Sequence, residues 1–308
     1  MQRVILEVSL GPLQGTRKVL SPGEKLRVGR RERADLVVPD DLMSAPHFEI
    51  AWDGARCTLQ DLQSQKGTFL GGQKVKAAEL GNASWIRAGG SDFFLFFEEA
   101  TPAPVDREEE LLDADEDDVD PATAHWLRLH RGKKKDALKA REARAEAALE
   151  ALRKAPGPLF AVLDAARSDR ILTLLQESVE TYRSLYEGIP GDALAHVAPY
   201  LVSLPQGSRL LERLVREGWG KRWGSFLTCR RPFKDVRRHL RRFLMVADAD
   251  TRQRFYFRFY DPGVLRSFFP AATERQRVEL FGEIETFLVE GERGEVLRFD
   301  APRAGEVG

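Results

Sequence analysis

Residues 26–48 read LRVGRRERADLVVPDDLMSAPHF. A glycine and an arginine stand side by side at positions 29 and 30, an apolar run follows at 36–38, and a serine and a histidine stand at 44 and 47. Upstream, residues 4–10 alternate apolar with polar or small side chains, which is the period of a half-buried strand. Turn signals recur at short intervals, at 21–23, 53–54, 71–72 and 89–90. Many short strands with frequent turns predict a sandwich or barrel over residues 1–100. One tight hairpin turn is expected at 52–55, between strands at 48–51 and 57–60.

Four ordered segments of this region resemble a forkhead-associated (FHA) domain, a phosphothreonine-binding β-sandwich. They are the glycine–arginine motif at 26–30, the strand at 35–40, the serine–histidine segment at 44–48 and the glycine–threonine loop at 61–70. The resemblance implies that Arg30 and Ser44 hold the phosphate, because a guanidinium and a hydroxyl donate to phosphate oxygens. It also implies that His47 and Gly29 brace the loops.

The glycine–threonine loop departs from the family at its ligand-gripping position. Lys66 stands where the family has an asparagine, Gln65 replaces a small residue, and Ala45 replaces a longer polar side chain. Asparagine offers a donor and an acceptor, whereas lysine offers donors only. Two interpretations stay open: Lys66 adds charge to a working phosphopeptide site, or the sandwich has lost phosphopeptide binding.

Two blocks of opposite charge lie between residues 1–100 and residues 156–300. Residues 106–120 carry ten acidic residues and a single arginine, so residues 101–127 are expected to be a disordered acidic linker. Residues 128–155 are basic and rich in helix formers, and they predict a helical linker that ends near Pro156. We expect residues 301–308 to be a flexible tail.

Residues 156–300 alternate strand and helix patterns, which predict an α/β domain with a mixed sheet. The expected strands are 159–163, 200–204, 225–229, 286–289 and 296–299, with a hairpin over 246–260. The expected helices are 168–176, 208–217, 233–244, 264–268 and 274–281.

Three segments of this second domain resemble type VI secretion effector adaptors, also called effector chaperones. They are 160–166 with its aspartate, 198–202 with its proline and tyrosine, and the paired segments 239–242 and 257–262. The resemblance points to Tyr200, His239, Arg242, Arg258 and Asp261 as the adaptor-domain signature. It implies a protein without catalytic activity that binds a toxic effector and delivers it to a spike tip protein of the VgrG/PAAR type.

The signature residues also have structural interpretations. Asp261 followed by Pro262 is a good helix start, with the aspartate as N-cap. His239, Arg242 and Arg258 are expected to form a polar cluster around Asp261. The basic segment 230–242 is either a solvated helix face or a docking surface for an acidic partner.

Aromatic residues of the second domain are mostly expected in the core. Trp219 and Trp223, either side of Gly220, are nevertheless our candidates for contacts with an effector, because tryptophan contributes disproportionately to interfaces.

The composition of the chain limits which other classes of function are possible. The 308 residues hold 48 basic and 48 acidic side chains, so no overall charge favours nucleic acid as a partner, and no apolar run suits membrane insertion. The two cysteines, Cys57 and Cys229, suggest neither a metal site nor a disulfide framework, and no cofactor motif is present. We expect a cytoplasmic adaptor. The alternatives are a phosphothreonine-dependent scaffold that regulates secretion assembly, and an enzyme using Cys229, His239 and Asp261.

Overall fold

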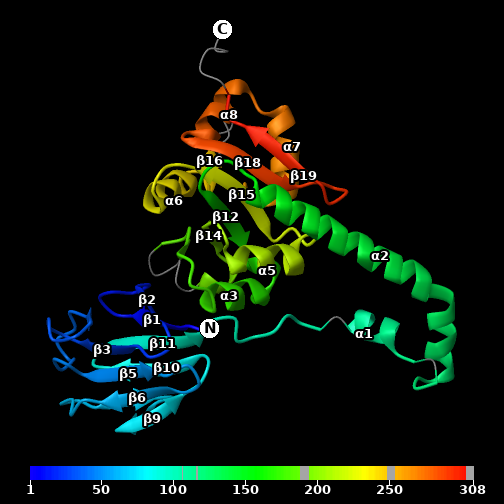
Figure 1. The fold of residues 1–308 in the computed structure, drawn as a ribbon. Helices are drawn as coiled ribbons and strands as arrows, with labels where there is room; N and C mark the ends of the chain where they lie inside the picture. Colours follow the sequence, from blue (N-terminus) through cyan, green and yellow to red (C-terminus); the bar gives the residue numbers. More distant parts are fainter. Residues whose placement is uncertain (106, 116, 188–193, 248–253, 303–308) are drawn as a thin grey trace. The chain divides into compact units, whose positions relative to one another are not determined.

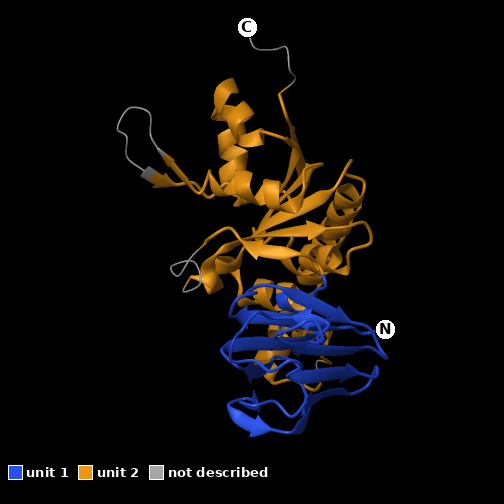
Figure 2. Cartoon of the chain, turned by 90° about the vertical axis from the view of Figure 1, so that its left-hand side faces the viewer, with its two compact units in different colours: residues 1–102, 176–179 blue, residues 103–175, 180–308 orange. Residues whose placement is uncertain are grey.

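The computed structural model describes residues 1–105, 107–115, 117–187, 194–247 and 254–302. The chain forms two compact units (Figures 1 and 2). The first comprises residues 1–102 together with 176–179, and the second comprises 103–175 and 180–308. Each unit is described by itself below.

The first unit is a β-sandwich of short strands. Strands β2 (Arg17–Leu20), β1 (Val4–Leu10), β11 (Ser91–Phe97), β10 (Ser84–Ala88), β7 (Thr68–Leu70) and β8 (Gln73–Val75) form one sheet in this order. The second sheet has the order β4 (Leu36–Val37), β3 (Lys25–Gly29), β5 (Phe48–Trp52), β6 (Cys57–Asp61) and β9 (Ala77–Leu80). The pair β3–β4 is parallel, and the other described pairs in both sheets are antiparallel.

The core of the sandwich follows from the alternation of the strands. Along β5, Phe48, Ile50 and Trp52 are buried while the residues between them are half-buried, so one face of the strand points inward. The β5–β6 hairpin lies where the sequence predicts it, with Trp52 paired to Cys57. Its turn is closed by the Asp53 carboxylate, which accepts hydrogen bonds from the amides of Ala55 and Arg56. The predicted all-β sandwich is confirmed.

The second unit combines helices with one large sheet. Its sheet has the order β13 (Tyr182–Ser184), β14 (Pro199–Leu204), β12 (Leu159–Asp164), β15 (Gly224–Cys229), β18 (Ile284–Glu290) and β19 (Val296–Asp300), with a separate hairpin of β16 (Met245–Ala247) and β17 (Arg254–Tyr256). The helices are α1 (Arg107–Asp113), α2 (Pro121–Arg153), α3 (Asp169–Gln176), α5 (Arg209–Gly218), α6 (Phe233–Arg241), α7 (Pro262–Ala271) and α8 (Glu274–Phe281), with short turns η1 (Ala165–Arg167) and η2 (Ala195–Val197).

Both faces of this sheet are covered by helices. Alternate residues of the central strand β12 enter two different cores, and all six of its residues are buried. Leu159, Ala161 and Leu163 pack with α3, α5 and the end of α2, whereas Phe160 and Val162 pack with α6, α7 and α8. The unit is therefore a three-layer domain, as a strand that is apolar on both faces predicts.

The pairing within the sheet adds a detail that the sequence did not supply. We expected a mixed sheet, and every described strand pair of this sheet is antiparallel. Strand β13, at one edge of the sheet, was not expected, because three residues are too few to show a period. The expected hairpin over 246–260 is present as β16 and β17, and its connection at 248–253 lies outside the described residues.

The charged segment between the domains contains helices. Helix α1 and the first turns of α2 lie within residues 101–127, which we expected to be disordered. Leu112 and Leu127 are almost fully buried, and Lys135 pairs with Asp113 at 2.7 Å. Helix α2 starts at Pro121 because the side chain of Asp120 caps the amides of Ala122 and Thr123. An aspartate followed by proline is the same start signal that we recognised at position 261. The flexibility of 101–127 stays a prediction, and residues 303–308 of the expected tail lie outside the described residues.

Candidate functional site

The first candidate site lies at the end of β3, where the chain turns from Gly29 into Arg30. A Cβ atom at position 29 would stand 2.9 Å from the Cα of Pro46 and 2.9 Å from the carbonyl oxygen of Ser44. Any side chain there would push apart the two loops that carry Arg30 and Ser44. Gly29 is therefore required by close backbone approach, which agrees with its expected bracing role.

Ser44 connects the three loops of this site. Its carbonyl accepts the amide hydrogen of Arg30 at 3.0 Å, and its hydroxyl oxygen accepts the amide hydrogen of Gln65 at 2.9 Å. A serine hydroxyl has one hydrogen to donate and two lone pairs. Since Gln65 uses only a lone pair, the hydroxyl hydrogen remains available for a ligand oxygen.

His47 is fully buried beneath these loops. Its Nδ1 accepts the amide hydrogen of Ser44 at 2.9 Å, so Nε2 carries the proton and donates it to the carbonyl of Gly67 at 3.2 Å. Burial lowers the pKa of His47, which favours the neutral form that these two bonds require. The histidine thus fixes the serine loop against the glycine–threonine loop, as the resemblance implies.

Asp61 holds the glycine–threonine loop from inside, and the sequence analysis did not single it out. Its carboxylate accepts from the Ser64 hydroxyl and amide and from the Thr68 hydroxyl, at 2.5, 3.0 and 2.6 Å. Burial raises the pKa of Asp61, but the hydrogen bonds from Ser64 and Thr68 outweigh burial and lower it overall. The sequence does contain a signal for this role, because the hydroxyl residues Ser64 and Thr68 follow Asp61 by three and seven positions.

The cationic side chains of the site remain accessible. The Arg30 side chain is 35% exposed, and its Nη1 lies 3.3 Å from the carbonyl and 3.7 Å from the carboxylate of Asp41. Asp41 is itself fully exposed, so the pair is weak and replaceable by another anion. Lys66 is exposed, and the amide of the preceding residue, Gln65, donates to the Ser44 hydroxyl. The structure therefore brings Arg30, Ser44 and the Lys66 loop together.

The second unit contains a buried carboxylate cluster built around the adaptor signature. Asp261 is 3% exposed and accepts hydrogen bonds from Arg222 (2.6 Å to Nη2), Arg167 (2.6 Å to Nη2) and the amide of Gly263 (2.8 Å). It is the N-cap of α7 with Pro262 in the first turn, so the predicted helix start is confirmed. Burial raises the pKa of Asp261, but the bonds from Arg222, Gly263 and Arg167 outweigh it and hold the pKa below its usual value.

Our expected cluster around Asp261 was wrong in its members. Arg258 pairs with the buried Asp164 rather than with Asp261. His239 donates from Nε2 to the carbonyl of Leu280 at 2.8 Å, and its Nδ1 accepts from Arg242 at 2.6 Å. His239 lies on α6 and Arg242 caps its end. The bond from His239 to Leu280 holds α6 against α8. Arg242 lies three positions from His239, but the partners Leu280 and Asp164 are set by long-range packing, about which sequence spacing carries no information.

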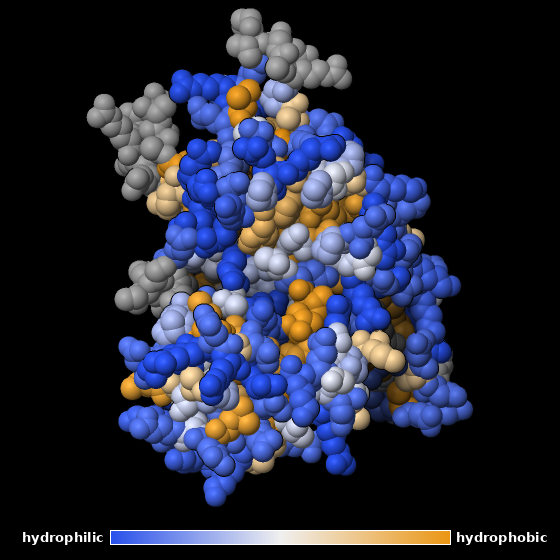
Figure 3. Space-filling model, turned by 60° about the vertical axis from the view of Figure 1, so that its left-hand side comes forward, coloured by the Kyte–Doolittle hydropathy of each residue, from blue (hydrophilic) through white to orange (hydrophobic). Residues whose placement is uncertain are grey.

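Tyr200 and the two tryptophans occupy core positions. The Tyr200 hydroxyl donates to the carbonyl of Ala195 at 2.9 Å, which fixes η2 to the start of β14. Trp219 and Trp223 are each only 7% exposed. The Trp219 indole donates to the carbonyl of Gly294 at 2.7 Å, and Trp223 fills the space over Gly218. This burial contradicts our expectation that the two tryptophans contact an effector. Hydrophilic residues cover much of the face shown in Figure 3, with hydrophobic patches between them.

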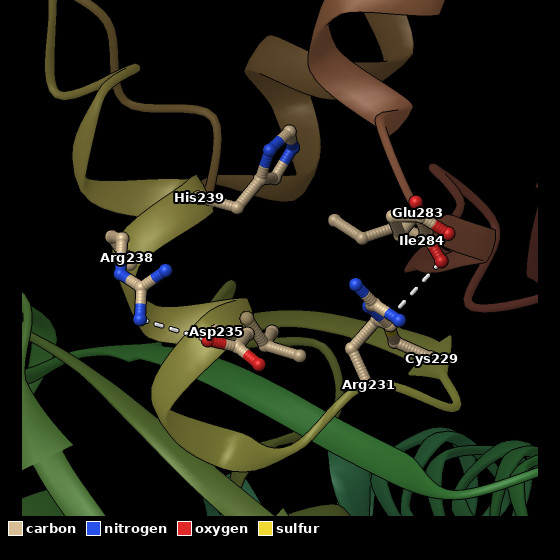
Figure 4. Close-up of a pocket in the computed structure, with 8 residues that line it drawn as sticks. Cys229, Arg231, Asp235, Arg238, His239, Glu283 and Ile284 are labelled. Atoms are coloured by element: carbon tan, nitrogen blue, oxygen red, sulfur yellow. Dashed lines mark hydrogen bonds and ion pairs between the residues drawn. The ribbon is translucent and has the colours of Figure 1, made fainter.

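The alternative enzymatic triad is not assembled. Cys229 and His239 line one cavity of about 300 Å³ with Asp235, Arg238 and Glu283 (Figure 4). The Cys229 thiol donates to the carbonyl of Glu283 at 3.2 Å, and burial raises its pKa, so it is held as a thiol. Both ring nitrogens of His239 are occupied as described, and Asp261 is committed to Arg222 and Arg167. Nucleophile, base and orienting acid therefore lack the required contacts.

Comparison with protein families agrees with this division. Residues 26–89 match the FHA domain model, and residues 159–279 match the family described as "Domain of unknown function (DUF4123)". The chain therefore carries an FHA domain at its N-terminus, followed by a DUF4123 domain. The latter belongs to a family associated with type VI secretion effector adaptors, and both are interaction domains.

Two curated relatives and one solved structure are each similar to less than a third of this chain. The chain is 35% identical to FHA domain-containing protein FhaA of Mycobacterium tuberculosis over 22% of its own length and 13% of FhaA. It is 36% identical to FhaB of the same organism over 24% of its own length and 46% of FhaB. It thus spans less than half the length of these relatives. The solved FHA domain of FhaA in complex with the intracellular domain of Rv3910 is 32% identical, with a TM-score of 0.28, over 30% of this chain and 98% of that one. Within the described residues, no helix is long and apolar enough to cross a membrane.

Proposed function

We propose that this protein is a type VI secretion effector adaptor whose FHA domain supplies a second, phosphothreonine-dependent contact. In this proposal the DUF4123 domain binds a toxic effector and helps to load it onto a spike tip protein of the VgrG/PAAR type. The adaptor works in the cytoplasm and carries out no catalysis.

The geometry around Ser44 carries the phosphothreonine part of the proposal. The hydroxyl hydrogen of Ser44 is free to donate, because the amide of Gln65 occupies only a lone pair of the oxygen. Arg30 stands on the adjoining loop, bound through its amide to the Ser44 carbonyl, and among the described residues its guanidinium pairs with the exposed Asp41 alone. A hydroxyl donor and an accessible guanidinium on rigid, mutually bonded loops suit a phosphate group.

Lys66 is compatible with this function but changes its character. Lys66 is exposed on the loop whose Gln65 amide bonds Ser44, so a second cation besides Arg30 is within the same group of loops. It cannot accept a hydrogen bond from the ligand backbone as an asparagine would. We therefore expect affinity to depend more on charge, and so more on salt concentration, than a site with asparagine would.

The effector-adaptor part rests on the match of residues 159–279 and on the way its signature residues are used. Asp164, Asp261 and their arginines fix the ends of the central strands and the start of α7. These contacts support a rigid scaffold rather than a reaction centre, because each carboxylate is already satisfied by arginine.

The second candidate function is a phosphothreonine-dependent scaffold that regulates secretion assembly. The same Arg30–Ser44 geometry favours it, since both functions use the site in the same way. The two differ in whether the effector itself, or only a phosphorylated regulator, needs the FHA site.

Capture from the native cell tests the proposal. The tagged full chain, its Arg30→Ala variant and, as a control at the other end of the sandwich, its Arg56→Ala variant are purified with and without phosphatase treatment of the lysate. We expect an effector and a spike protein to co-purify with all three, and a phosphatase-sensitive partner to be lost only with Arg30→Ala. An effector that is lost together with the phosphorylated partner would favour the scaffold. Absence of any secretion component would contradict the adaptor.

A further inference from the structure

A depression of about 700 Å³ adjoins the phosphate position on the FHA domain. It is lined by the loop that follows β3 and by two neighbouring small or apolar residues: Arg30, Arg31, Glu32, Arg33, Val37 and Ala45. Three of the six are arginines and only one is acidic. The depression therefore carries an excess of positive charge next to the residue that is placed to bind phosphate.

Two of these arginines are exposed and uncommitted. Arg31 and Arg33 are both exposed, and within the part of the chain that the structure describes neither forms an ion pair or a side-chain hydrogen bond. Arg30 differs, because its guanidinium faces Asp41. Glu32 stands between these two arginines in the sequence, and its carboxylate has no hydrogen-bond or ion-pair partner among the described residues. An anionic ligand group would find their donors unoccupied.

The loop that presents these arginines is held in one conformation. The amide of Ala34 donates to the carbonyl of Arg31 at 2.9 Å, and the amide of Asp35 donates to the carbonyl of Arg27 at 2.9 Å. The Asp35 carboxylate accepts a hydrogen bond from the Arg27 amide at 2.8 Å. With the bond from the Arg30 amide to Ser44, these contacts fix the backbone that carries Arg31 and Arg33 next to the phosphate position, so that only their side chains need ordering on binding.

Ala45 keeps the depression open. It follows Ser44 directly and lines the depression with a single methyl group. A longer side chain at this position would extend into the same space. Val37 is 39% exposed and adds an apolar surface for the methylene groups of a ligand side chain. The space thus suits a side chain that is aliphatic near its backbone and anionic at its end.

We propose that Arg31 and Arg33 form a second anion subsite that selects phosphothreonine peptides carrying another anionic side chain near the phosphothreonine. This inference rests on the proposed phosphothreonine binding and adds its ligand class. The anionic side chain is a glutamate or aspartate, or a second phosphorylated residue, because all of them present oxygen atoms to guanidinium groups. Glu32 limits this preference by repelling the same group.

The test is a binding titration of the full chain with labelled peptides. One peptide has a phosphothreonine and alanine at every flanking position, one series places a single glutamate at each flanking position in turn, and another places a second phosphothreonine there. The proteins are wild type, the double variant Arg31→Gln/Arg33→Gln, the variant Glu32→Gln, and a control double variant Lys25→Gln/Arg56→Gln. Lys25 begins β3 and Arg56 follows β5, at the ends of these strands opposite to those next to the site, so the control removes equal charge elsewhere.

We expect the wild type to prefer the best glutamate peptide about fivefold over the alanine peptide, the range that two exposed ion pairs provide. Arg31→Gln/Arg33→Gln should abolish most of this ratio while the alanine peptide still binds, and Glu32→Gln should raise it. The control should leave the ratio unchanged. A larger gain from a second phosphothreonine than from glutamate identifies that group as the ligand, and the reverse identifies a carboxylate.

Failures of the two proposals are distinguishable. If no phosphothreonine peptide binds the wild type, the proposed FHA function is overturned together with the subsite. If the alanine and glutamate peptides bind equally, or the control variant lowers the ratio as much as Arg31→Gln/Arg33→Gln, phosphothreonine binding stands and the second subsite is overturned.

Discussion

Asp261 provides the sharpest test of how the second domain is held together. Its carboxylate is 3% exposed, caps α7 through the amide of Gly263, and accepts hydrogen bonds from Arg167 and Arg222 at 2.6 Å each. Arg222 has a positive φ of 57°, a conformation that non-glycine residues rarely adopt, and its bonds to Asp261 help to hold it. We predict that Asp261→Ala destabilises this domain strongly and that Asp261→Asn does so less.

The magnitude follows from two contributions. Loss of an N-cap costs about 1 kcal/mol. Loss of a charged acceptor for two arginines adds about 2 kcal/mol, less than for a fully buried pair, because the side chains of Arg167 and Arg222 are 31% and 45% exposed and become hydrated when unpaired. The alanine variant should therefore lose about 3 kcal/mol and the asparagine variant, which keeps the cap, about 2 kcal/mol.

The assay is urea denaturation of the full chain, followed by hydrogen exchange of peptides from β15 and α7 so that the second domain is observed separately. Asp235→Asn is the matched control: this residue pairs with Arg238, whose side chain is 72% exposed, and the change should cost less than about 1 kcal/mol. Because the pKa of Asp261 is lowered in the folded state, its stabilisation is present above the pKa of the unfolded chain and is lost as the pH falls below about 4. An Asp261→Ala variant within about 1 kcal/mol of the wild type would refute the reasoning.

Further predictions concern both domains and the segment between them. Gly29→Ala should destabilise the FHA domain by about 2 kcal/mol and weaken phosphopeptide binding, because its Cβ would meet the Pro46 and Ser44 backbone; calorimetry of the full chain measures both. The pKa of His47 is lowered by burial, so the FHA domain should lose stability as the pH falls below about 6.5, and His47→Gln should flatten this dependence in thermal unfolding scans at several pH values. Cys229 should resist thiol reagents in the folded protein, because burial raises its pKa; rapid modification, measured by mass spectrometry, would contradict the thiol state described. Limited proteolysis should cut within residues 101–125 first and leave two resistant fragments, and resistance throughout the segment would disprove its expected flexibility.

Local signals in the sequence were enough to predict most elements of both domains. The alternation along β1, the β5–β6 hairpin, the strand β12 and the Asp261–Pro262 start of α7 are all predicted by the sequence, because each depends on neighbours within a few residues. The start of α2 at Asp120–Pro121 was missed although it carries the same signal. The acidic composition of the surrounding segment predicts disorder, whereas the cap signal at its end predicts a helix, and the structure has the helix.

The candidate sites divide in the same way. Arg30, Ser44 and His47 could be assigned because the FHA motifs preserve both residue type and spacing. The partners of Asp261 could not be predicted from the sequence, since Arg167 and Arg222 lie 94 and 39 positions away and belong to other parts of the fold. The expected cluster with His239 and Arg242 failed for this reason. Asp61 has its partners nearby in sequence, and its role was open to prediction.

The sequence by itself determined the two-domain order, the type of each domain and the residue types of the proposed phosphate site, because these depend on periodicity, turn residues and short motifs. Only the tertiary structure decided which side chains meet. It buried Trp219 and Trp223, committed Asp261 to Arg167 and Arg222, and left Arg31 and Arg33 exposed beside the small Ala45. The physical reason is that burial and ion pairing are set by the packing of distant segments against one another, whereas helix and strand formation begins with residues that are adjacent in the chain.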